Sequence, residues 1–189
     1  MKKFQCLKCG TCCRNLIVNF GDWTLGLILL PEETNLFPES LIAPMWGIGV
    51  KGRSRPRPEK VCVFQLNTKI CVHLTDKNTC RIYAERPLIC HAHPLNIQVA
   101  EGRLISASVN GSCKGISRMP VNRNIKLSDY FEDDILEANT ILSTYLERMF
   151  VESHGYVWLY DLASCKWKRV TLDSYPKCEV KTSECLREN

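Results

Sequence analysis

The sequence predicts an α+β fold: a small cysteine-rich metal-binding domain of short strands and loops. Two patterns lead to this fold class: short runs of β-branched and aromatic residues between turn residues, and one long amphipathic helix near 129–154 followed by a C-terminal hairpin. The third observation is the number of cysteines, twelve in 189 residues. This length suits one domain with its own core. We therefore expect a single domain over 1–189, with a cysteine-cluster core at 4–115 and a helix-plus-hairpin extension at 126–189.

The first half of the chain predicts short elements. The segments read as strands are 15–20, 61–64 and 70–72. Pro31, Glu32 and Glu33 indicate the start of a short helix, and we expect short, irregular elements over 31–50. Residues 75–78 have the composition of a turn. Pro87 suits the first turn of a helical segment that would carry Cys90.

The second half predicts longer elements. Residues 96–100 and 103–109 indicate a hairpin, and 156–162 and 165–172 a second one. Between them, apolar residues at steps of three and four predict a helix from about Asp129 to His154. Ser128 would be its N-cap and Gly155 would end it. We expect this helix to belong to the hydrophobic core rather than to the functional site, because it carries no cysteine.

Composition and charge limit the function classes. The net charge is +5, and a basic, proline-broken segment at 51–60 would suit an acidic partner. It contains no aromatic residue to stack a base, so we expect a solvated connection and no nucleic-acid partner. We expect no signal peptide, because no apolar stretch follows the lysines at the N-terminus, and we find no apolar run long enough to span a membrane. We expect a cytoplasmic protein with reduced thiols, which favours metal binding over disulfides.

The first thirteen residues carry the pattern C-x-x-C-x-x-C-C, with Cys6, Cys9, Cys12 and Cys13. A C-x-x-C step lets a tight turn direct two thiolates at one ion, and Gly10 can supply a positive φ there. Adjacent side chains of an extended chain point to opposite faces. We therefore expect Cys12 and Cys13 to face different partners, and their serine variants to have unequal effects on bound metal.

A second group of cysteines lies further along the chain, at Cys71, Cys80, Cys90 and Cys113. Eight sulfurs are compatible with two four-thiolate sites, and also with one site and spare cysteines. Zinc would favour C-x-x-C pairs in both halves, whereas wide spacings suit a larger cluster bound from separate loops. Glycines flank Cys113 and would let backbone approach it closely. We interpret the remaining cysteines as buried or free thiols, with a further site as the alternative: Cys62, Cys165, Cys178 and Cys185.

These residues resemble a known family. The N-terminal run, Cys71, the Cys80-Arg81-Ile82-Tyr83 block and the Arg86-Pro87-Leu88-Ile89-Cys90 block are similar to the CxxCxxCC family, the putative zinc- or iron-chelating domain (YkgJ-like), often labelled Fe–S oxidoreductase. The resemblance covers about residues 4–115. It implies chelating roles for seven of the eight cysteines, and Cys113 is a weaker match. A related pattern occurs in flagellin lysine methylases, which are iron–sulfur proteins.

The sequence departs from the family after Cys90. Family members usually continue with arginine, an aromatic residue and proline, whereas this chain has His91, Ala92, His93 and Pro94. The two histidines could ligate metal or move protons, but we interpret them as loop residues, because neither has a charge partner in sequence. His73 and His154 we treat as structural or surface residues.

Three functional hypotheses follow. The first is an iron–sulfur protein with one or two clusters, of the 4Fe-4S kind, in electron transfer or in support of a redox or modifying enzyme. Its partner would be an unidentified protein, either a redox partner or a client. The second is a zinc protein with a structural or carrier role, and the third a modifying enzyme resembling flagellin lysine methylase. The sequence contains no hydrolytic or dinucleotide motif and names no catalytic residue.

Overall fold

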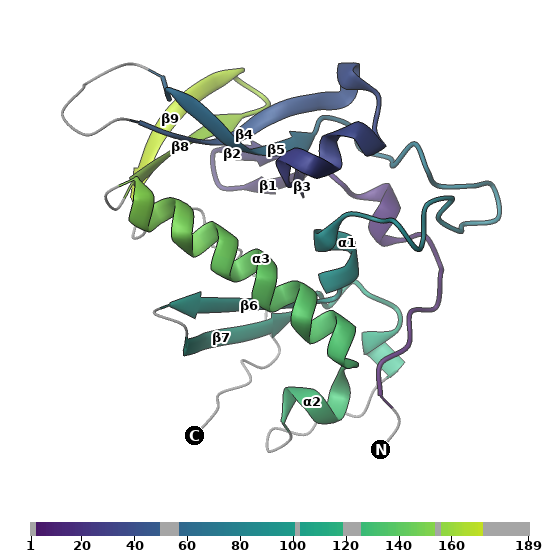
Figure 1. Cartoon of the computed structure of the whole chain (residues 1–189). Coiled ribbons are helices and arrows are strands. Elements are labelled where there is room, and N and C mark those ends of the chain that lie inside the picture. The colour runs from purple at the N-terminus through teal and green to yellow at the C-terminus, as the bar shows by residue number, and fades with distance from the viewer. Residues whose placement is uncertain (1–2, 50–56, 101–102, 119–125, 154–155, 172–189) are drawn as a thin grey trace. The chain divides into compact units, whose positions relative to one another are not determined.

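A computed structural model describes residues 3–49, 57–100, 103–118, 126–153 and 156–171 (Figure 1). It has the mixed helices and strands of the predicted α+β class. The chain divides into two compact units that are interleaved in sequence. The first contains the described parts of 1–13 and 73–145, and the second those of 14–72 and 146–178. The predicted single domain, with a core at 4–115 and an extension at 126–189, stays a prediction.

The second unit is built on a five-stranded antiparallel sheet in the order β3-β5-β4-β8-β9. Its strands are drawn together at the top of Figure 1. Their bounds are Leu27–Leu29 for β3, Ile42–Ile48 for β4, Lys60–Leu66 for β5, Tyr156–Asp161 for β8 and Lys166–Thr171 for β9. A hairpin of β1 (Val18–Phe20) and β2 (Trp23–Leu25) precedes the sheet, and the 3-10 helices η2 (Pro31–Leu36) and η3 (Glu39–Leu41) follow β3.

A buried glutamine ties the strands of this sheet together. The Gln65 side chain accepts a hydrogen bond from the Gly26 N–H at 2.7 Å. Its amide nitrogen donates to the Pro44 carbonyl at 2.7 Å and to the Tyr160 carbonyl at 3.1 Å. A fully buried amide needs such partners, because leaving its donors unpaired would cost about 1–3 kcal/mol each. Gln65 thus couples three segments that are distant in sequence.

Two expectations for this unit are corrected. Residues 31–50 do contain the predicted short helix at Pro31, but they also contain β4, a seven-residue strand in the middle of the sheet. Pro44 is tolerated there because it lies beside a register shift, the kind of place where proline enters sheets. Residues 70–72, predicted as a strand, lie in a loop and turn. The predicted strands at 15–20 and 61–64 correspond to β1 and β5.

The first unit packs α3 against the hairpin of β6 (Leu95–Ala100) and β7 (Arg103–Val109), as Figure 1 shows. Asn139 and Ser143 of α3 accept hydrogen bonds from the backbone N–H groups of Ile97 and Val99, at 3.3 and 2.7 Å. The smaller helices are α1 (Leu88–Ala92), α2 (Leu127–Tyr130), η1 (Cys12–Arg14) and η4 (Ile116–Arg118). The core consists of Phe4, Leu95, Ile97, Ala107, Tyr130, Phe131 and Ile135.

The predicted long helix is present, but it begins later than expected. α3 spans Asp133–Glu152, and α2 is a separate turn before it. The chain is extended at Phe131, with φ −118° and ψ 146°, because its side chain is buried in the core beside the Phe4 ring. Ser128 therefore lies inside α2 and does not cap α3. The helix positions predicted to face the core are buried at Ile135, Ala138, Leu142 and Met149.

Both predicted hairpins are confirmed, as β6–β7 and β8–β9. Within the described ranges, no helix is long and apolar enough to cross a membrane. Several predictions fall outside those ranges: most of the basic segment at 51–60, the helix end at His154 and Gly155, the last residue of the second hairpin at 172, and Cys178 with Cys185.

Candidate metal centre

Seven of the eight predicted ligands lie in the first unit, on four segments that are far apart in sequence. The N-terminal segment carries four of them, the turn after His73 carries Cys80, α1 carries Cys90, and the turn after β7 carries Cys113. The eighth, Cys71, belongs to the second unit. Cys62, which is buried, and Cys165, which is exposed, belong to it as well.

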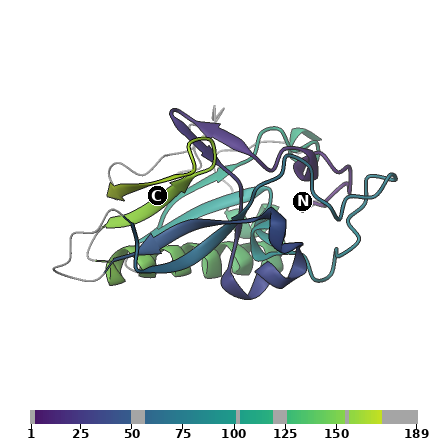
Figure 2. The same ribbon diagram turned by 90° about the horizontal axis from the view of Figure 1, so that it is seen from above.

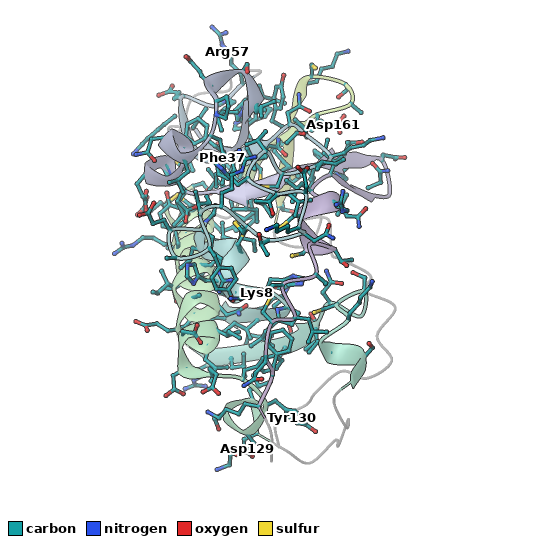
Figure 3. All side chains as sticks on the ribbon, turned by 90° about the vertical axis from the view of Figure 1, so that its right-hand side faces the viewer. Lys8, Phe37, Arg57, Asp129, Tyr130 and Asp161 are labelled. Atoms are coloured by element: carbon teal, nitrogen blue, oxygen red, sulfur yellow. The ribbon has the colours of Figure 1, made fainter. Side chains whose placement is uncertain are left out.

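The N-terminal segment is attached to this unit by its fourth residue. The Phe4 N–H donates to the Tyr130 carbonyl at 2.7 Å, and its ring lies 5.9 Å from that of Phe131. Figure 3 shows the segment passing Tyr130 on its way to Lys8. Gly115 permits the close approach, since a Cβ there would lie 2.6 Å from the Phe4 ring. The expectation that the glycines beside Cys113 let backbone approach a bulky site stays a prediction: Gly115 is crowded by the Phe4 ring, and Gly111 has open space around it.

The C-x-x-C turn is tight, as expected. Lys8 has φ 49° and Gly10 has φ 68°, both in the left-handed region. The Lys8 N–H donates to the Cys6 sulfur at 3.4 Å, which is the N–H···S contact of such a turn. A Cβ on Gly10 would lie 2.9 Å from the Leu74 side chain and 3.2 Å from the Asn78 carbonyl oxygen. The turn is therefore in contact with the loop that leads to Cys80.

The backbone at the doubled cysteine is not extended. Cys12 and Cys13 begin the 3-10 turn η1, and their sulfur atoms lie 4.0 Å apart. The expectation that they point to opposite faces is wrong, because a 3-10 turn separates adjacent side chains by about 120° rather than the roughly 180° of an extended strand, and here the two sulfurs meet. Two thiolates on one tetrahedral ion, with metal–sulfur bonds of about 2.3 Å, would lie about 3.8 Å apart. Whether they bind one centre or two stays a prediction.

The thiols of this segment differ in acidity. The hydrogen bond with Cys13 lowers the pKa of Cys12 to about 6, and the positive charge of Arg86 acts in the same direction. A hydrogen bond with Thr11, at 3.3 Å, lowers the pKa of Cys9. A thiolate is the form that binds metal, so Cys12 is prepared for ligation at neutral pH.

Electrostatic interactions also link the cysteines across segments. Burial raises the pKa of Cys113, and the negative charges of Cys12 and Cys6 raise it further. The charge of Cys12 likewise opposes ionisation of Cys9. The thiols of Cys6, Cys9, Cys12 and Cys113 therefore lie close enough for the charge of one to affect another.

Cys80 and Cys90 are held by local hydrogen bonds. Cys80 forms an isolated antiparallel bridge with Leu74, and the next residue, Arg81, donates its N–H to the His73 carbonyl at 2.9 Å. In α1, the Cys90 N–H donates to the Pro87 carbonyl at 2.8 Å. Both cysteines are half-buried. The predicted turn and the helical segment around Cys90 are thus confirmed.

The two histidines after Cys90 are neutral at pH 7. Burial, followed by the positive charge of Arg86, lowers the pKa of His93 to about 4. The same two causes lower the pKa of His91. A neutral imidazole can accept a proton or bind a metal. Arg86 thus acts on Cys12 as well as on both histidines, a role that the spacing of the cysteines does not reveal.

Among the described residues, no three histidine, cysteine, aspartate or glutamate side chains are close enough together to hold a metal ion. The ligand assignment for the eight cysteines stays a prediction. The chemistry of the donor set nevertheless fits a metal, because thiolates are soft ligands that suit zinc and iron–sulfur clusters. A thiol with a pKa of about 6 beside a guanidinium also fits an anionic thiolate centre.

Comparison with known proteins points in the same direction. The sequence matches the family described as "CxxCxxCC: Putative zinc- or iron-chelating domain" over residues 5–114. It is also similar to a protein of Methanocaldococcus jannaschii that is named as uncharacterized, with 30% identity over 110 residues. That similarity covers 53% of this chain and 50% of the relative, so the chain spans about half of the relative's length. No solved structure matches the chain.

Proposed function

The chain belongs to the CxxCxxCC family of zinc- or iron-chelating domains, and from this premise we propose that its first unit binds an iron–sulfur centre through cysteine thiolates. The observation that carries the proposal is the collection of seven cysteines, from four separate segments, in one compact unit. Clusters are commonly bound in this way, by thiolates from separate loops. Four thiolates complete one cluster, so the seven predicted ligands of the first unit suffice for one; the eighth, Cys71, belongs to the second unit.

The role that we propose is electron transfer, or support of a redox or modifying enzyme. When bound, an iron–sulfur cluster supplies a one-electron redox centre whose potential depends on charge, burial and hydrogen bonds to sulfur. The chain's own contribution would be to hold the thiolates ionised, through the Cys13 hydrogen bond to Cys12 and the charge of Arg86. Its partner would be a protein that exchanges electrons with this unit.

A second candidate is a single zinc ion with a structural or carrier role. The 4.0 Å separation between the Cys12 and Cys13 sulfurs favours it, because this is close to the separation of two thiolates on one tetrahedral ion. In a cluster with one cysteine on each iron, the sulfurs would lie further apart.

The test is purification without oxygen, followed by absorption spectroscopy and iron, sulfide and zinc analysis. We expect brown protein with broad absorption near roughly 400 nm. Cys12→Ser and Cys90→Ser should lower the metal content and destabilise the chain, because metal binding and folding are coupled. Cys165→Ser is the matched control, since this exposed thiol lies in the second unit. Colourless protein with stoichiometric zinc would favour the second candidate, and full metal content in both ligand variants would refute the assignment.

A further inference from the structure

Arg86 carries a hydrogen-bond donor that has no acceptor. Its Nε atom is buried, and among the described residues it has no hydrogen-bond partner. A buried donor without an acceptor destabilises the folded chain, more so when it is charged, so such atoms generally have a partner in the working protein. Arg86 immediately precedes Pro87, at the start of the helical turn that carries Cys90.

The guanidinium is also held in place. Its Cζ atom lies 4.1 Å from the centre of the Tyr83 ring, within the range of a cation–π contact. The Lys8 ammonium lies 4.7 Å from the same ring centre. Tyr83 thereby connects the C-x-x-C turn to the segment before α1, two parts of the chain that carry predicted ligands. Figure 3 labels Lys8, the lysine of the C-x-x-C turn.

The charge of Arg86 has no carboxylate partner among the residues that the structure describes. Within the part of the chain that is described, Arg86 forms no ion pair; the ion pair found in the first unit joins Lys3 and Glu132. Two cysteine-bearing segments lie next to it: the C-x-x-C turn, whose Lys8 shares the Tyr83 ring with Arg86, and α1, which carries Cys90. A bound thiolate is the anion that these segments can supply, so the missing countercharge is to be sought among the cysteines.

We propose that Arg86 is a positioning residue of the metal centre, whose guanidinium offsets the negative charge of the bound thiolates and whose Nε–H donates a hydrogen bond to one of its sulfurs. This inference rests on the proposed function, because it requires a thiolate centre in the first unit. Four thiolates around a divalent ion leave a net charge of −2, and a neighbouring cation stabilises such a centre. Because the Tyr83 ring contacts both Lys8 and Arg86, it holds the guanidinium beside the C-x-x-C turn.

The experiment compares Arg86→Gln, Arg86→Lys and the control Arg81→Gln in the full chain loaded with its own metal. Arg81 is exposed and lies in the same segment, so its side chain serves as a matched cation. The measurements are the midpoint reduction potential, the rate of metal loss to a chelator and the circular dichroism spectrum. They separate an effect on the centre from an effect on the fold.

In Arg86→Gln we expect a lower reduction potential, because removing a cation favours the less negative, oxidised centre. Metal affinity should fall about 10–100-fold, as is typical when a residue that supports a ligand is removed, and metal loss to the chelator should be correspondingly faster. Arg86→Lys should show a smaller shift in potential, since it keeps the charge and loses the Nε–H. Arg81→Gln should match wild type. Wild-type potential and metal loss in Arg86→Gln would overturn the inference.

If Arg86→Gln does not fold, Arg86→Lys decides alone, and an unchanged potential and chelation rate in that variant overturn the inference. If the protein contains zinc, the cluster proposal fails and the chelation rate remains as the test. Faster zinc loss from Arg86→Gln than from Arg81→Gln would then support the role of Arg86, and equal rates would overturn it. A protein that binds neither metal would overturn both proposals.

Discussion

At the scale of single residues, the doubled cysteine shows how one turn changes the chemistry of a thiol. The 3-10 turn brings the Cys12 and Cys13 sulfurs to 4.0 Å, and the resulting hydrogen bond favours the thiolate form of Cys12. A group whose pKa is lowered in the folded state stabilises that state when ionised. For Cys12 this contribution is complete above its ordinary pKa of 9.0 and is lost as the pH falls through about 6.

The lowered pKa of Cys12 predicts how the reactivity of this thiol depends on pH in the metal-free protein. Alkylation of Cys12 by iodoacetamide, followed by peptide mass spectrometry, should remain fast at pH 7 and slow down as the pH falls through about 6. Cys13→Ala removes the hydrogen-bond partner, so in this variant the decline should occur at higher pH. Identical pH profiles in the two proteins would show that Cys13 does not control the Cys12 thiol.

At the scale of elements, the N-terminal segment depends on two contacts in the first unit. The Phe4 N–H donates a hydrogen bond to the Tyr130 carbonyl, and the Phe4 ring packs beside the Phe131 ring. The burial of Phe131 also separates α2 from α3, because the chain is extended there. Figure 2 gives a second view of the N-terminal segment and the helices, turned by 90°. The four N-terminal cysteines are positioned through Phe4 and the turn at Gly115, so this turn controls the geometry of a distant segment.

Gly115→Ala tests this dependence. A Cβ at this position would lie 2.6 Å from the Phe4 ring, so the segment must move. We expect a loss of about 1–3 kcal/mol in the free energy of unfolding, as overpacking generally causes, together with reduced metal content. Gly111→Ala is the control in the neighbouring turn, because nothing lies within 4 Å of a Cβ there. Equal unfolding and metal content in both variants would contradict the expectation.

At the scale of the whole molecule, the predicted ligands and the larger sheet are in different units. Seven ligands lie in the first unit, while the sheet of β3, β5, β4, β8 and β9 forms the second, with Val63, Leu66, Val157 and Leu159 fully buried. Units with their own cores can open separately. Metal is therefore expected to stabilise the first unit more than the second.

Hydrogen exchange of the loaded and the chelated protein measures this difference. After chelation, exchange should accelerate at the Arg81 and Cys90 amides, whose hydrogen bonds hold ligand-bearing turns. The amides of β8 and β9, such as those of Val157 and Val170, should keep their protection. Simultaneous loss of protection in both units would show that the chain opens as one cooperative body.

The sequence by itself determined the α+β class, the two hairpins, most of the long helix and the family. These features depend on local periodicity, turn residues and the spacing of cysteines, which are readable in a single chain. The start of α3 was misjudged because the burial of Phe131 against Phe4 depends on residues more than a hundred positions apart. The strand around Pro44 was missed because its neighbours β5 and β8 override the proline signal.

Only the tertiary structure decided how the cysteines are arranged. Spacing alone left the partner of each sulfur open, because long loops impose little on pairing. Folding brings the Cys12 and Cys13 sulfurs together, collects seven of the predicted ligands in one unit, and places Arg86 where its charge acts on a thiol. The approach of the two sulfurs comes from the local 3-10 turn, whereas the collection of the predicted ligands in one unit depends on contacts between residues far apart in sequence, such as Phe4 with Tyr130 and Lys8 with Tyr83. Such contacts arise only when the chain packs, and for that reason the sequence predicts which cysteines chelate, whereas the fold determines how they are arranged.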